Sequence, residues 1–190
     1  MKIKVFKIVL VSLVLVFLTA CNVQENNSSN MTDNKEEENM ETTNLSGIVP
    51  DELAYIPDDY YTSVNQQGTL NKLTYHTWES FSYEEHSQPL TEEAWVYLPA
   101  NYDANRQYNI FYLSHGGWSN ETTIMGTEQN PTSFKNVIDH AIEDGKIQPM
   151  IIVLLTYNNT SDHDSWDYSL ALDLTDQFHN ELVNDLILAV

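Results

Sequence analysis

Cysteine is almost absent from this sequence, and the one cysteine present is Cys21. A single thiol forms no disulfide within the chain and no thiolate metal cluster, so the fold must be stable without either. The sequence implies no cofactor and no metal ion. Any function of this cysteine must therefore follow from its position near the N-terminus.

Basic residues are also scarce. The chain has 8 Lys and Arg against 28 Asp and Glu, which gives a formal net charge of −20. A surface this acidic repels nucleic acid and anionic lipid headgroups, and it lacks the basic patch that phosphate binding requires. The charge suits an exported protein that acts on neutral material such as polysaccharide. The simpler interpretation is that the acidity only keeps an exported protein soluble, because net charge alone rarely identifies a substrate.

Residues 1–20 carry the pattern of a secretory signal peptide. Three lysines within the first seven residues precede an almost wholly apolar run over Ile8–Leu18. This run is shorter than the roughly 20 residues of a transmembrane helix, and small residues follow it. A cysteine directly after Thr19 and Ala20 resembles a bacterial lipobox, in which Cys21 is lipidated. We therefore expect a lipoprotein anchored to the bacterial membrane through Cys21, with an ordinary signal peptide as the alternative.

A polar segment over residues 21–46 follows. It is rich in Asn, Glu, Ser and Thr and has few aliphatic residues. Such a segment buries too little apolar surface to offset the entropy cost of ordering, so we expect a disordered tether. Aromatic residues and turn residues become frequent from about residue 47. Residues 47–190 are close to the usual size of one domain, and we expect one domain there.

Short apolar runs predict three strands in the first part of this domain. Gly68–Trp78 and Glu93–Pro99 are the first two, and the second alternates aliphatic with aromatic residues in the period of a strand. The polar stretch between them fits a hairpin connection. Asn109–Ser114 is a third, compact strand that ends in the sequence His-Gly-Gly.

The second part of the domain changes to helical periodicity. Apolar residues from Phe134 to Ile142 fall on one helix face, with Thr132 or Ser133 as the N-cap and Gly145 as a left-handed end. The continuous apolar run Pro149–Tyr157 predicts a strand covered on both faces, parallel to the preceding strand. A second helix is expected over Leu170–Leu188. This order of elements indicates an α/β fold.

Three short motifs follow one another along the chain: Val96-Tyr97-Leu98-Pro99, His115-Gly116-Gly117 and Gly145-Lys146-Ile147-x-Pro149-Met150-Ile151. In this order and spacing they resemble the putative esterase family, which includes feruloyl and acetylxylan esterases and esterase D. The resemblance covers about residues 68–190. It implies the N-terminal part of an α/β-hydrolase sandwich, with strand order 1-2-4-3-5, and an ester hydrolase with a serine, histidine and acid triad.

The resemblance also implies a role for the segment after the third strand. In this fold a backbone N–H there forms half of the oxyanion hole, so the candidate donors are Gly117 and Trp118. Gly116 would give the backbone room to approach, and His115 would support the loop through hydrogen bonds. Trp118 would also contact substrate at the mouth of the site. The alternative is that the glycines only form a tight turn.

The remaining catalytic parts of the family have no counterpart in this sequence. The family nucleophile lies in a Gly-x-Ser-x-Gly elbow, and no pair of the six glycines brackets a serine in this way. Ser114 and His115 are adjacent on a strand, so their side chains point to opposite faces and cannot act together. We therefore expect an N-terminal fragment of a secreted carboxylic ester hydrolase, of the type that acts on plant polysaccharide esters, inactive as this chain. We also expect a marginally stable fold that associates through the apolar edge at Asn109–Ser114.

Two other readings stay open. The acidic turn around Asp162, His163, Asp164 and Asp167 is interpreted as a solvated loop, with a calcium site as the alternative. The rival function is a surface lipoprotein that binds carbohydrate without catalysis, through the loops that carry Trp118 and Trp166.

Overall fold

The computed structural model describes residues 55–190. The predicted signal peptide, the lipidation site at Cys21 and the tether over residues 21–46 lie outside the described residues. From Tyr55 to Val190, no helix has both the length and the apolar character needed to cross a membrane.

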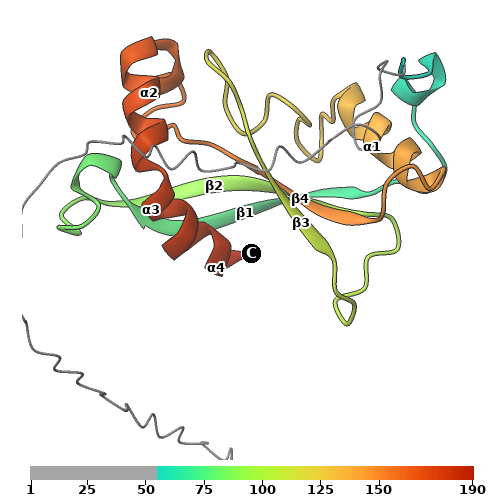
Figure 1. Cartoon of the computed structure of the whole chain (residues 1–190), viewed down its shortest axis with the longest axis horizontal. Helices are drawn as coiled ribbons and strands as arrows, with labels where there is room; N and C mark the ends of the chain where they lie inside the picture. The colour runs from blue at the N-terminus through green and yellow to red at the C-terminus, as the bar shows by residue number, and fades with distance from the viewer. Residues whose placement is uncertain (1–54) are drawn as a thin grey trace, which may run out of the picture. The chain divides into compact units, whose positions relative to one another are not determined.

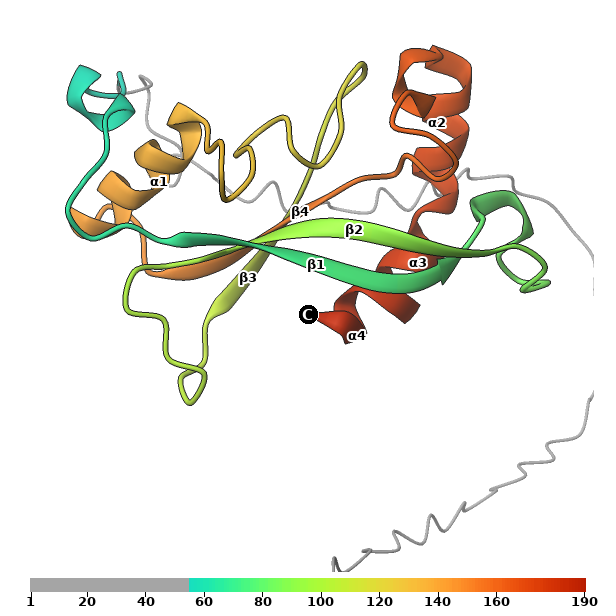
Figure 2. The ribbon, with the colours of Figure 1, turned by 180° about the vertical axis from the view of Figure 1, so that it is seen from behind.

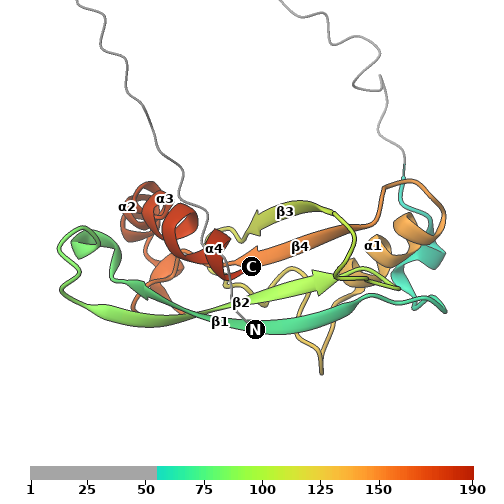
Figure 3. The ribbon, with the colours of Figure 1, turned by 90° about the horizontal axis from the view of Figure 1, so that it is seen from below.

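A four-stranded sheet forms the centre of the described part (Figure 1). Its strands are β1 (Thr69–Trp78), β2 (Pro89–Leu98), β3 (Asn109–Ser114) and β4 (Met150–Leu155), in the order β1-β2-β4-β3. The β1–β2 and β2–β4 pairs are antiparallel, and β3 runs parallel to β4. Figure 3 shows β3 and β4 side by side along the upper edge of the sheet. The predicted α/β class and the strand order are confirmed for this part of the chain.

Helices pack on both faces of the sheet, to which successive side chains of β4 point alternately. Val153 and Leu155 pack with the second helical segment, whereas Ile152 and Leu154 pack beside partly buried residues of α1 (Ser133–Glu143). The second segment comprises α2 (Tyr168–Gln177), α3 (His179–Glu181), a π-helical turn (Leu182–Leu186) and α4 (Ile187–Ala189). Figure 2 shows α1 and α2 near opposite ends of the strands.

The ends of α1 confirm one sequence prediction and correct another. Gly145 has φ +67° and donates to the carbonyl of Ile142, while Lys146 donates to that of Ala141. This pair of bonds is a Schellman motif, so the predicted left-handed end is confirmed. Thr132 occupies the N-cap, but its hydroxyl donates to the Ile124 carbonyl and caps no helix N–H.

Two element boundaries differ from the sequence prediction. Strand β2 begins at Pro89, ahead of the expected Glu93, because residues 89–92 continue the ladder with β1. The second helical segment begins at Tyr168, because Asp167 caps it by accepting from the N–H groups of Ser169 and Leu170. The expected helix over Leu170–Leu188 is present, but with a π turn inside it.

Strand β3 lies at the edge of the sheet. Within residues 55–190 it pairs with β4 alone, so its other side presents unpaired backbone groups. Ile110 and Phe111 on this strand are 44% and 51% exposed. The predicted apolar edge at Asn109–Ser114 is therefore present in the described part of the chain.

Candidate active site

The parallel strands β3 and β4 end side by side and bring two loops together. Ser114 pairs in register with Leu155, so the segment that starts at His115 lies beside the segment that starts at Thr156. In open α/β sheets, ligands bind at the carboxyl ends of the strands. The candidate site is therefore built from the loop after β3 and the loop after β4.

His115 joins these two loops. Its side chain is buried, with 6% exposure, and its Nδ1 lies 2.7 Å from the carbonyl oxygen of Gly116. Its Nε2 lies 2.8 Å from the hydroxyl oxygen of Thr156. The imidazole also stacks on the ring of Tyr157, with 4.4 Å between the centroids. Burial lowers the pKa of His115, so the ring is neutral at physiological pH.

Ser165 fixes the other end of the loop after β3. The N–H of Trp118 donates to the Ser165 carbonyl at 3.0 Å, and the N–H of Ser119 donates to the Ser165 hydroxyl at 3.1 Å. The Ser165 hydroxyl in turn donates to the Ser119 carbonyl at 2.7 Å. These bonds hold Trp118 at φ +58°, a left-handed conformation that costs a non-glycine residue on the order of 1–3 kcal/mol.

The two candidate oxyanion donors are therefore not equivalent. The Trp118 N–H is already donated to Ser165, whereas the Gly117 N–H has no acceptor among the described residues. A Cβ at Gly117 would lie 3.7 Å from the Ser165 carbonyl, and one at Gly116 would meet no atom within 4 Å. The expected steric need for glycine at position 116 is thus not found in this part of the chain. Gly117 remains the predicted oxyanion donor.

An apolar pocket adjoins Gly117. It has a volume of about 250 Å³ and is lined mainly by aromatic and aliphatic side chains from the two loops and from α2. Trp118, Tyr157, Tyr168 and Leu172 are among the residues that line it. Trp118 and Tyr168 are 71% and 73% exposed, so they stand at its opening. Such a surface suits a flat apolar group better than a charged one.

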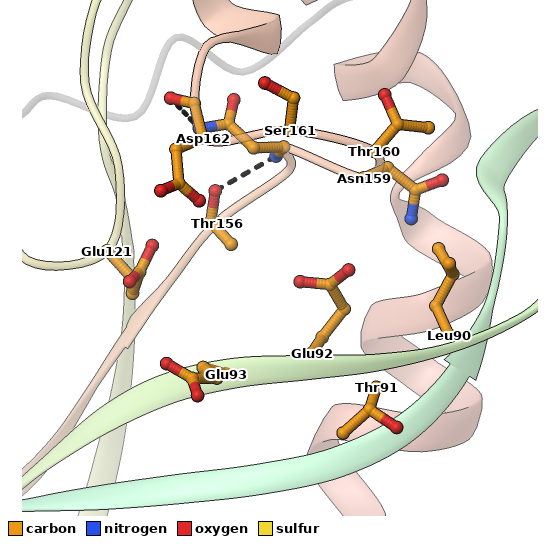
Figure 4. Close-up of a pocket in the computed structure, with 11 residues that line it drawn as sticks. Leu90, Thr91, Glu92, Glu93, Glu121, Thr156, Asn159, Thr160, Ser161 and Asp162 are labelled. Carbon is orange, nitrogen blue, oxygen red and sulfur yellow. Dashed lines mark hydrogen bonds between the residues drawn. The ribbon is translucent and has the colours of Figure 1, made fainter.

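An acidic cavity lies on the other side of the loop after β4 (Figure 4). Its volume is about 460 Å³, and the carboxylates of Glu92, Glu93, Glu121 and Asp162 surround it. Burial, together with the negative charges of Glu121 and Glu93, raises the pKa of Glu92 to about 7. Burial also raises the pKa of Glu121. The cavity is therefore unfavourable for the binding of anionic ligands.

The acidic turn expected to be solvated is partly buried. Asp164 is 7% exposed and accepts hydrogen bonds from the N–H groups of Asn159 and Thr160. Asp167 caps α2. Both carboxylates thus hold the loop in shape, and no cluster of acidic or histidine residues with metal-binding geometry occurs within residues 55–190.

The structure brings together residues that the sequence did not connect. His115, Gly116, Gly117 and Trp118 lie in one loop as expected, but Thr156, Tyr157 and Ser165 complete the site from 41 or more positions away. No local pattern marks these three residues. The parallel pairing of the predicted strands was the one signal that could have placed residues 156 and 157 beside His115.

Comparisons with known proteins find a matching family and several similar proteins. Residues 91–184 match the model of the family described as Putative esterase. Endo-1,4-beta-xylanase Y of Acetivibrio thermocellus is 40% identical over 102 residues, which are 54% of this chain and 8% of the xylanase.

Two solved structures that are similar to this chain are esterases. A feruloyl esterase module from Clostridium thermocellum complexed with sinapinate is 37% identical, with TM-score 0.46, over 57% of this chain and 34% of that one. A ferulic acid esterase from Anaeromyces mucronatus in complex with ferulic acid is 20% identical, with TM-score 0.47, over 70% and 47%. This chain thus spans less than half the length of each of these relatives. On the family match over residues 91–184, the chain belongs to the Putative esterase family.

Proposed function

We propose that this chain supplies the scaffold, one oxyanion donor and the acyl pocket of a carboxylic ester hydrolase of the feruloyl or acetylxylan esterase type. The observation that carries the proposal is the apolar pocket lined by Gly117, whose N–H has no acceptor within residues 55–190. An aromatic acyl group in this pocket would bring its ester carbonyl close to that N–H. The relatives complexed with sinapinate and ferulic acid support an aromatic acyl group.

We propose further that the chain alone hydrolyses no ester. The sequence has no Gly-x-Ser-x-Gly segment, and no serine hydroxyl bonds a histidine ring among the described residues. Two threonine hydroxyls do contact imidazoles, Thr156 at His115 and Thr91 at His76. Thr156 and His115 are both buried, and neither imidazole bonds a carboxylate that would orient it as a base.

A fluorophosphonate probe tests for a reactive nucleophile. The probe forms a stable bond with the activated serine of serine hydrolases, and an active feruloyl esterase serves as the positive control. We expect no labelling of the purified chain above that of the heat-denatured chain. Stoichiometric labelling of any residue would contradict the proposal that the chain lacks a nucleophile.

The location proposed for the protein is the outer side of a bacterial membrane, to which lipidated Cys21 attaches it. The lysine-rich start, the short apolar run and the single cysteine support this. Metabolic labelling with radioactive palmitate should mark the wild-type chain and leave Cys21→Ser unlabelled. Equal labelling of both would contradict lipidation at Cys21.

Carbohydrate binding without catalysis is the second candidate function. Trp118 and Trp166 are 71% and 58% exposed, and both adjoin Ser165. Exposed aromatic rings can stack on sugars. Pull-down on insoluble xylan that is lost in Trp118→Ala, together with no affinity for ferulate, would favour this function over the esterase proposal.

A further inference from the structure

The peptide group between Gly116 and Gly117 is held by two hydrogen bonds on one side. The Gly116 carbonyl oxygen lies 2.7 Å from Nδ1 of His115 and accepts from the hydroxyl of Tyr157 at 3.2 Å. A carbonyl oxygen has two lone pairs, and both are used here. Rotation of this peptide would break both bonds, so its orientation is fixed.

The other side of the same peptide carries the Gly117 N–H, which has no acceptor in the described part of the chain. No cis peptide occurs in the described part of the chain, and in a planar trans peptide the N–H points opposite to the carbonyl. The Gly117 N–H therefore faces away from the His115 ring and the Tyr157 hydroxyl. The next two N–H groups, of Trp118 and Ser119, are both taken by Ser165.

The hydrogen-bond pattern also fixes the tautomer of His115. Because a carbonyl only accepts, Nδ1 must carry the proton that reaches Gly116. In the neutral ring, Nε2 is then an acceptor, and the Thr156 hydroxyl donates to it. The Thr156 oxygen accepts in turn from the N–H of Asn158 at 3.0 Å. Each hydrogen bond in the series from the Asn158 N–H to the Gly116 carbonyl therefore has only one possible donor.

We propose that His115, Thr156 and Tyr157 are positioning residues, which aim the Gly117 N–H at the carbonyl oxygen of an ester by locking the Gly116 carbonyl. This inference rests on the proposed function, because it assigns a purpose to the Gly117 N–H. Thr156 acts through His115, and His115 and the Tyr157 hydroxyl act through Gly116. A purely structural role of Tyr157 would depend on its ring, which stacks on His115, and not on its hydroxyl.

Nuclear magnetic resonance on the ¹⁵N-labelled chain separates these roles. Without ligand, the shifts of the two His115 ring nitrogens should show a proton on Nδ1 and none on Nε2. The Gly117 amide should exchange with solvent faster than that of Trp118, which is hydrogen-bonded. On titration with sodium ferulate, whose carboxylate stands for the ester carbonyl, the Gly117 amide should shift downfield.

Two substitutions test the positioning. Tyr157→Phe keeps the ring and should abolish most of the ferulate-induced shift at Gly117, with ferulate affinity about threefold to tenfold lower. Thr156→Val should leave His115 in mixed tautomers, and Thr156→Ser should restore the single tautomer. Tyr112→Phe is the matched control, because the Tyr112 hydroxyl has no hydrogen-bond partner within residues 55–190.

The outcomes distinguish the two proposals. A His115 proton on Nε2, or a Gly117 amide as protected as that of Trp118, would overturn the positioning role whether or not ferulate binds. Equal ferulate responses in wild type, Tyr157→Phe and Thr156→Val would overturn it as well. Failure of ferulate to bind the wild-type chain would overturn the proposed function, while the ligand-free tautomer and exchange data would still decide whether the peptide is locked. If Tyr157→Phe fails to fold, the Thr156 pair decides.

Discussion

The hydroxyl of Tyr157 donates a hydrogen bond to the carbonyl oxygen of Gly116, a residue 41 positions earlier in the chain. This contact joins the loop after β4 to the loop after β3, and it lies on the peptide that carries the candidate oxyanion donor. The site is therefore a product of parallel strand pairing. The strands end together, and the loops that leave them fix each other.

Glu181 should make the protein less stable as the pH rises. Its carboxyl is 3% exposed, and burial raises its pKa to about 8, although the hydrogen bond from Tyr75 opposes the shift. Because this pKa is above the unfolded value of about 4.3, the folded state binds the extra proton. The stabilisation is complete below about pH 4 and is lost as the pH rises through about 8.

Urea unfolding at pH 5 and pH 8 measures this effect. The free energy of unfolding should fall by on the order of 3 kcal/mol between these values. Glu181→Gln, which cannot ionise, should lose most of that dependence, with the remainder due to Glu92. A stability that is flat or rises with pH would show that Tyr75 and Asn159 hold Glu181 ionised.

At position 118, glycine should give a more stable protein than alanine, which is the reverse of the usual order. Trp118 has φ +58°, which glycine adopts without strain and alanine does not. We therefore expect Trp118→Gly to be about 1 kcal/mol more stable than Trp118→Ala. Both variants lose the same exposed indole, so its contacts cancel in the comparison. Thermal unfolding that ranks the alanine variant higher would rule out the left-handed backbone.

Breaking the buried ion pair of α1 should lower the free energy of unfolding far more than breaking an exposed ion pair. Lys135 and Asp139 lie 2.7 Å apart with side-chain exposures of 6% and 1%, and Asp139 also accepts from Gly68 and Tyr97. Lys135→Met leaves a buried carboxylate without its partner and should cost about 3 kcal/mol of unfolding free energy. The exposed pair of Lys72 and Glu93 supplies the control. Lys72→Met should cost less than about 1 kcal/mol, and equal costs would contradict the burial argument.

The apolar edge at β3 should cause self-association. Ile110 and Phe111 are exposed on a strand with no charged residue, beside unpaired backbone groups. Sedimentation velocity should show an average mass that increases with concentration, and Phe111→Lys should suppress the increase. Phe81→Lys adds the same charge at a residue that is 56% exposed and away from this edge. If Phe81→Lys suppresses association equally, net charge and not the edge is responsible.

The sequence predicted those elements that depend on local patterns. Strand β3 lies at Asn109–Ser114 as expected, because an apolar run this short, bounded by turn residues, is typical of a buried strand. The left-handed end of α1 at Gly145 was predicted for a similar reason. The hydrogen bond from the Trp118 N–H to Ser165 was not predictable, because it joins residues 47 positions apart, one in a loop and the other in a short 3-10 turn. The acidic cavity depends on which face of β2 carries Glu92, and this follows from pairing with two other strands.

Incubation of the purified chain with methyl ferulate shows whether it binds an aromatic ester without hydrolysing it. Chromatography of the sample measures released ferulate, and quenching of tryptophan fluorescence measures binding. The Trp118→Phe variant shows which part of the fluorescence signal comes from Trp118. We predict saturable binding at the apolar pocket and no ferulate release above the rate in buffer. Sustained release by the isolated chain would contradict the absence of a nucleophile, and an absence of binding would contradict the acyl pocket.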